Sequence, residues 1–169
     1  MIKFESEKHL EDFICENLDG GVCLIDNIDF DTYQRQYRCG EYGIADIVAF
    51  NCVEVNGKPE ILEIYIYELK NERFSVKNLA QVAKYHTYFQ RVASELYPNL
   101  SISVYSAVVC LDDGLTDDEY VANIDDFSIP IYKYSICPIN GFEIQPASGI
   151  KLKEESLSEC EHINNLMGV

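Results

Sequence analysis

The stretch ILEIYIYELK, residues 61–70, predicts a buried β-strand that ends in two charged residues. Alternation along a strand places Ile66, Glu68 and Lys70 on one face, which they share with the apolar residues before them. A charge without a partner is costly to bury, so apolar strands rarely retain one without a reason. The end of this strand is therefore the first place to look for a functional site.

The composition of the whole chain is typical of a globular protein. Of its 169 residues, 47% are hydrophobic and 25% are charged, so we interpret residues 1–169 as a single domain with a sizeable core. No apolar run approaches the roughly 20 residues of a membrane-spanning helix, and the acidic, amphipathic start is unlike a secretory signal. Together with seven cysteines that form no C-x-x-C pair, these features favour a cytoplasmic protein with free thiols and no membrane partner.

The net charge of −16 is distributed unevenly along the chain. A uniformly acidic surface would repel a polyanion, whereas a local positive band allows contact with nucleic-acid phosphates. Such a band lies between residues 70 and 91, where Glu72 is the one acidic residue. The basic residues of this band are Lys70, Arg73, Lys77, Lys84 and Arg91.

Hydrophobic periodicity predicts an α/β fold with a mixed central sheet and flanking helices. The expected helices are 6–18, 75–96 and about 154–166, the first two capped by Ser6 and Ser75. The expected strands are 32–39, 44–55, 60–70, 101–111, 127–136 and 141–145, with a turn at 56–59 that makes the second and third antiparallel. Pro130 predicts that the strand 127–136 lies at an edge of the sheet. The acidic run 112–126 is expected to be a solvated surface.

Three charged residues are expected to converge at one end of this sheet. Asp46 is the lone charge in the first ten residues of strand 44–55, and the turn at 56–59 brings that strand beside the one that carries Glu68 and Lys70. Two neighbouring carboxylates repel each other unless a cation lies between them, and their oxygens suit Mg²⁺ or Mn²⁺. A lysine beside such a metal can orient or deprotonate a water and counter phosphate charge. This set of residues predicts phosphodiester hydrolysis.

The sequence GIADIVAF…EIYIYELK resembles the core of the PD-(D/E)XK nuclease superfamily, which includes restriction endonucleases, archaeal Holliday-junction resolvases and RecB-like nucleases. Gln81 and Tyr85, in AQVAKY, are similar to the Q-x-x-x-Y helix of the RecB-like branch. The proline of the family name is replaced by Ala45. The resemblance implies a restriction-endonuclease-like αβββαβ core over about residues 5–111, a C-terminal elaboration over 112–169, and a Mg²⁺- or Mn²⁺-dependent deoxyribonuclease.

The resemblance also implies a role for each residue of the site. Asp46 and Glu68, with the carbonyl of Leu69, would bind the metal, and Lys70 would activate the water. Gln81 would help to shape the site. The residues expected at the DNA are Tyr85, Arg73, Lys77, Lys84 and Arg38.

Two residues of the first helix could supply the further metal-site glutamate that many members of the superfamily have. They are Glu7 and Glu11, one turn apart, and we favour Glu7 because it shares the helix face of Leu10 and Ile14. Arg35 could extend the basic band. His86 is expected to be a surface residue rather than a general base.

Other interpretations of the same residues remain open. Glu68 and Lys70 could form an idle ion pair, and the basic residues of the second helix could be a solvated face. The net charge of −16 also supports a non-catalytic acidic interaction module, or a DNA mimic, on the same fold. A nuclease subunit that needs a basic partner protein would reconcile both features. The sequence does not determine whether the protein is a homodimer.

Overall fold

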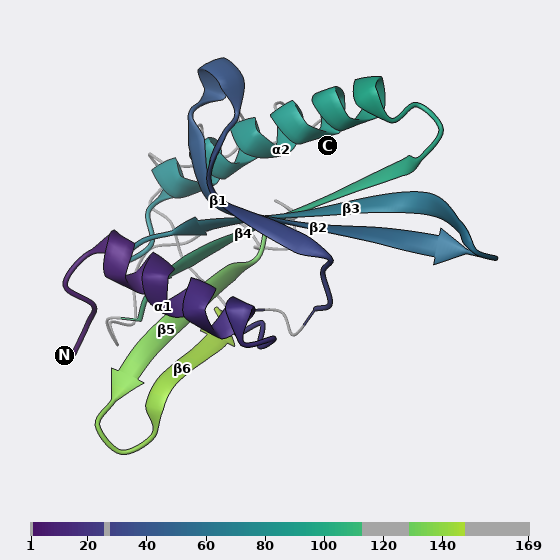
Figure 1. The fold of residues 1–169 in the computed structure, drawn as a ribbon. Helices are drawn as coiled ribbons and strands as arrows, with labels where there is room; N and C mark the ends of the chain where they lie inside the picture. The colour runs from purple at the N-terminus through teal and green to yellow at the C-terminus, as the bar shows by residue number, and fades with distance from the viewer. Residues whose placement is uncertain (1, 26–27, 113–128, 148–169) are drawn as a thin grey trace.

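The computed structural model describes residues 2–25, 28–112 and 129–147. They form an α/β fold with a six-stranded mixed sheet and two helices, as the periodicity predicted (Figure 1). The helices are α1, Glu7–Asp19, and α2, Val76–Leu96, with a short 3₁₀ helix η1 at Gly40–Tyr42. The expected helix at 154–166 and nearly all of the acidic run 112–126 lie outside the described residues. The single-domain interpretation stays a prediction.

The six strands follow one another across the sheet in chain order. The three strands β1, β2 and β3 are antiparallel neighbours, β3, β4 and β5 are parallel, and β6 returns antiparallel to β5. Their bounds are Thr32–Arg38 for β1, Ile44–Val55 for β2, Lys58–Leu69 for β3, Ser101–Leu111 for β4, Ile131–Cys137 for β5 and Gly141–Pro146 for β6.

A tight hairpin sets the register of β2 against β3. Asn56 and Gly57 both have positive φ, 54° and 74°, as a two-residue turn of this hand requires. The turn is shorter than expected, because Lys58 already belongs to β3. The pairing of Ile47 with Tyr67 brings the first residues of β2 beside the last residues of β3. This end of the hairpin carries the predicted site.

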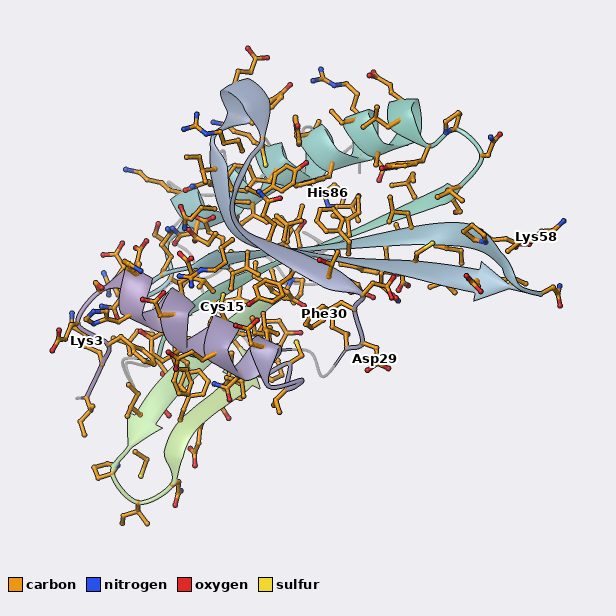
Figure 2. All side chains as sticks on the ribbon, in the orientation of Figure 1. Lys3, Cys15, Asp29, Phe30, Lys58 and His86 are labelled. Carbon is orange, nitrogen blue, oxygen red and sulfur yellow. The ribbon has the colours of Figure 1, made fainter. Side chains whose placement is uncertain are left out.

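The two helices cover opposite faces of the sheet (Figure 1). Successive strand residues point to opposite faces, so Ile66 packs with Phe89 of α2, whereas Leu69 packs with Leu10 of α1. Figure 2 shows His86 on α2 and Cys15 on α1, on the two sides of the sheet. The sheet is therefore buried on both faces near its centre.

The prediction that Pro130 marks an edge strand is wrong. β5 lies between β4 and β6, and β1 and β6 are the edges of the sheet. Pro130 immediately precedes β5, and its carbonyl accepts a hydrogen bond of 3.1 Å from the N–H of Val108. Proline lacks only the donor, so it is tolerated at the start of an internal strand.

Two general expectations can be compared with the described part of the chain. No helix within it is long and apolar enough to cross a membrane. The cysteines at positions 15, 23, 39, 52 and 137 carry free thiols.

Candidate functional site

Asp46, Glu68 and Lys70 lie together where β2 begins and β3 ends. Asp46 Oδ2 accepts a hydrogen bond of 2.8 Å from the N–H of Leu69. Lys70 Nζ lies 2.9 Å from Glu68 Oε1. The structure thus brings together the three residues that the sequence pattern singled out.

The carboxylate of Glu68 is buried and only half satisfied. Its side chain is 1% exposed, and Oε2 has no hydrogen-bond partner among the described residues. Burial, with a further contribution from the charge of Asp46, raises the pKa of Glu68 to about 7, although Lys70 opposes this shift. Buried polar atoms almost always have partners, so an orphaned carboxylate oxygen indicates a position that a ligand or cation can complete.

Lys70 is held among carboxylates. Its side chain is 13% exposed, and besides Glu68 it contacts Glu7, whose Oε2 lies 3.3 Å from Nζ. Burial by itself would lower the pKa of Lys70, but the carboxylates of Glu68, Asp46 and Glu7 raise it above its ordinary value. A lysine in this state is a cation and a hydrogen-bond donor, so it is suited to orienting a water rather than to removing its proton.

Asp46 is partly buried and is held by two donors. Gln36 Nε2 lies 3.2 Å from Oδ1, in addition to the Leu69 N–H on Oδ2. Burial raises the pKa of Asp46, and the Leu69 N–H, Lys70 and Gln36 partly counter that rise. A carboxylate has about four lone-pair positions, so each oxygen still has room for a further partner.

The two candidate glutamates of α1 have different environments. Glu7 lies beside Lys70, as described above. Glu11 is 6% exposed, and its two oxygens accept hydrogen bonds of 2.6 Å from Arg35 Nε and Gln36 Nε2. Glu11 is therefore fully engaged by β1, and the choice of Glu7 as a further metal-site residue stays a prediction.

Gln81 and Tyr85 form a buried polar link to the start of β2. Tyr85 is 1% exposed, its hydroxyl donates to the carbonyl of Ile44 at 2.7 Å, and it accepts from Gln81 Nε2 at 2.8 Å. Contact between Tyr85 and a nucleic-acid backbone does not fit this burial. A Cβ added at Gly43, where φ is 116°, would lie 3.2 Å from the Tyr85 hydroxyl, so this approach requires glycine.

The basic residues divide into exposed and paired ones. Arg38 on β1, Arg73 after β3, and Lys77 and Lys84 on α2 are exposed. The expectation that Arg35 extends this band is wrong, because its guanidinium is bound by the carboxylates of Glu11 and Asp12. This pairing could not be read from the strand pattern, since it joins β1 to α1.

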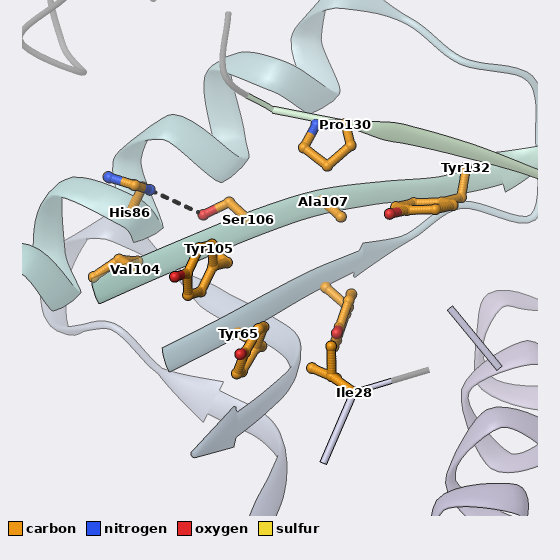
Figure 3. Close-up of a pocket in the computed structure, with 10 residues that line it drawn as sticks. Ile28, Tyr65, His86, Val104, Tyr105, Ser106, Ala107, Pro130 and Tyr132 are labelled. Carbon is orange, nitrogen blue, oxygen red and sulfur yellow. Dashed lines mark hydrogen bonds between the residues drawn. The ribbon is translucent and has the colours of Figure 1, made fainter. Parts of the chain in front are cut away.

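A second hollow lies along β4, away from the charged residues. It is a cavity of about 600 Å³ lined largely by aromatic rings, including Tyr65 and Tyr105, which stack with centroids 4.9 Å apart (Figure 3). His86 Nδ1 lies 3.2 Å from Ser106 Oγ at its border. The expectation that His86 is a surface residue is wrong, because it is half-buried and its pKa is lowered by burial. Nothing in the strand periodicity indicated this cavity.

No ready-made metal cage exists in the part of the chain that the structure describes. No group of three or more His, Cys, Asp or Glu side chains is arranged there to hold a metal ion. In the arrangement seen, the ammonium of Lys70 supplies the positive charge beside Glu68 and Glu7.

Comparison with protein-family models finds no match, and a search of curated proteins finds none either. The functional argument therefore depends on the chemistry of the site.

Proposed function

We propose that the protein is a metal-dependent nuclease that hydrolyses phosphodiester bonds in DNA. The observation that carries the proposal is the buried Glu68 carboxylate, which has one oxygen without a partner and lies beside Lys70 at the end of a strand. A buried acid in this state destabilises a fold, and such groups are concentrated at functional sites. A purely structural ion pair would not need the unsatisfied oxygen.

The order of the elements supports the proposal by resemblance. Helix α1, the antiparallel strands β1 to β3, helix α2 and the parallel strand β4 follow one another in the order of the PD-(D/E)XK core. Asp46 lies on the second strand, and the E-x-K sequence that ends in Lys70 spans the end of the third. The restriction-endonuclease-like arrangement is part of this proposal.

The donor atoms fit a hard divalent cation. Asp46 and Glu68 offer carboxylate oxygens and Leu69 offers a backbone carbonyl, which are the ligand types that Mg²⁺ and Mn²⁺ prefer. A cation bound there would act as a Lewis acid toward the phosphate and lower the pKa of a bound water. Lys70, as an ammonium, would orient the attacking water and neutralise charge on the phosphate. Gln81 and Tyr85 would hold the start of β2 in place.

The exposed basic residues would bind the phosphate backbone. They offer a sequence-independent attraction that can act despite the net charge of −16. The proposed contacts are Arg38, Arg73, Lys77 and Lys84.

Cleavage of supercoiled, linear and single-stranded DNA, with Mg²⁺ and with Mn²⁺, tests the proposal. We expect the wild type to cut at least one form and Asp46→Ala and Lys70→Ala to lose at least 100-fold in rate, the scale on which single catalytic groups act. Lys58→Ala is the matched control, because Lys58 lies on the same strand at the far end of the hairpin (Figure 2).

Two results would contradict the nuclease. One is the absence of cutting by the wild type together with no heat of Mn²⁺ binding. The other is cutting that Asp46→Ala retains at the wild-type rate, since it would identify a contaminating enzyme.

A second candidate is a non-catalytic acidic module that binds a basic protein or imitates DNA. The net charge of −16 favours it, as does the neutralisation of Glu68 by Lys70 in the structure. This candidate predicts no retention on DNA at low salt. A nuclease subunit that needs a basic partner would instead acquire cutting activity when that partner is added.

A further inference from the structure

Gln36 has an unusual backbone conformation for a residue inside a strand. Its φ is 49°, and among the described residues only Asn56 shares a positive φ without being glycine. Asn56 lies in the tight turn between β2 and β3, where this conformation is expected. In glutamine the left-handed conformation costs free energy, and strain of this kind is often retained at functional sites.

The side chain of Gln36 joins two elements that are distant in the sequence. Its Nε2 lies 2.6 Å from Oε2 of Glu11 on α1 and 3.2 Å from Oδ1 of Asp46 on β2. Gln36 is itself exposed, so apolar packing does not explain its conformation. The two N–H bonds of one amide thus bridge two carboxylates.

Glu11 is a rigid anchor for this bridge. It is buried, and its other oxygen accepts 2.6 Å from Arg35 Nε, whose guanidinium also binds Asp12. A continuous chain of hydrogen bonds therefore runs from α1 through β1 to Asp46.

We propose that Gln36 is a positioning residue that, anchored on Glu11 and Arg35, orients the Asp46 carboxylate for a divalent cation. The inference rests on the proposed function, in which Asp46 is a metal ligand. Gln36 occupies one lone-pair position of Oδ1 and the Leu69 N–H one of Oδ2, so the carboxylate is fixed while both oxygens remain available. Outer hydrogen bonds of this kind typically affect metal affinity by about 10–100-fold.

A purely structural role for Gln36 is the alternative that an experiment must separate. Arg35 contacts α1, whereas Tyr37 packs against Phe89 of α2 with ring centroids 4.9 Å apart. The left-handed residue between them is the point at which β1 passes from one face to the other. This role predicts an effect on stability and none on metal affinity.

Mn²⁺ binding by titration calorimetry, together with thermal unfolding of each protein, separates the two roles. We expect Gln36→Met, which keeps the length of the side chain and removes the amide, to bind Mn²⁺ at least about 10-fold more weakly than the wild type. Gln34→Met is the matched control, because Gln34 is an exposed glutamine of the same strand that makes none of these contacts. It should bind within twofold of the wild type.

A second variant keeps the test decisive if Gln36→Met does not fold. Asparagine tolerates the left-handed conformation, and in Gln36→Asn the shorter amide cannot bridge both carboxylates. We expect a wild-type melting temperature with the same weakening of Mn²⁺ binding.

The possible failures are distinguishable. Wild-type Mn²⁺ affinity in folded Gln36→Met and Gln36→Asn, with affinity lost in Asp46→Ala, would overturn this inference alone. A wild-type protein that binds no Mn²⁺ would overturn the proposed function and the inference with it.

Discussion

Glu68 shows at the scale of one residue how a site opposes the stability of its fold. Its ionised form is buried beside Asp46, and Lys70 compensates for this only in part, so the pKa lies near 7. The ordinary value is 4.5, and the folded state therefore favours the protonated carboxyl. The contribution of Glu68 to stability is complete below pH 4.5 and is lost as the pH rises toward 7.

The variant Glu68→Gln tests this at the residue scale. We expect it to be more stable than the wild type at pH 8, by up to about 3 kcal/mol at 1.36 kcal/mol per pKa unit, and equal to it near pH 4.5. Urea unfolding at both pH values measures the difference. Glu60→Gln, an exposed position on the same strand, should change stability little at either pH. A variant less stable than the wild type at pH 8 would contradict the account of Glu68.

At the scale of elements, the link between α2 and β2 holds the site in place. The Tyr85 hydroxyl joins Gln81 to the carbonyl of Ile44, two residues before Asp46, and Gly43 leaves it room. Most of the core contacts between α2 and the sheet are apolar, so they leave room for helix and strand to shift along each other. The buried hydroxyl provides a directional contact that apolar packing lacks.

Tyr85→Phe is therefore expected to destabilise the protein by about 1–2 kcal/mol, because it leaves a buried carbonyl and amide without their partner. Tyr88→Phe, on the same helix, is the control, since Tyr88 is recorded with ring contacts to Tyr42 and Phe89 that phenylalanine keeps. Equal unfolding free energies for both variants would show that the hydroxyl of Tyr85 contributes nothing.

At the scale of the whole molecule, an acidic protein retains a local basic surface. The net charge is −16, while Lys77 and Lys84 are exposed on α2 without an acidic residue between them in the sequence. If the protein binds DNA there, the affinity must fall steeply with salt.

We expect the slope of log K against log salt to lose about 2 in magnitude in the double variant Lys77→Ala/Lys84→Ala, about one for each lost phosphate contact. Lys58→Ala, at the tip of the β2–β3 hairpin, should leave the slope unchanged. Fluorescence anisotropy with labelled DNA over a range of salt concentrations measures it. An unchanged slope in the double variant would remove α2 from the interface and favour the acidic module.

Much of the fold could be predicted from the sequence, because its elements are set by local periodicity and local punctuation. The bounds of α1, α2, β2 and β4 agree with the predicted segments to within a residue, and Asn56-Gly57 determines the hairpin. The approach of Asp46 to Glu68 follows from counting back from that turn. These features depend on neighbours in the chain, so the sequence by itself determined them.

Contacts between distant segments decided the rest. The burial of Tyr85, the pairing of Arg35 with α1, the internal place of β5 and the strained bridge through Gln36 each depend on which elements pack together. A polar residue has the same local pattern whether its partner is water or a buried carboxylate. Only the tertiary structure distinguishes the two, because the free energy of a polar group depends on what surrounds it in space.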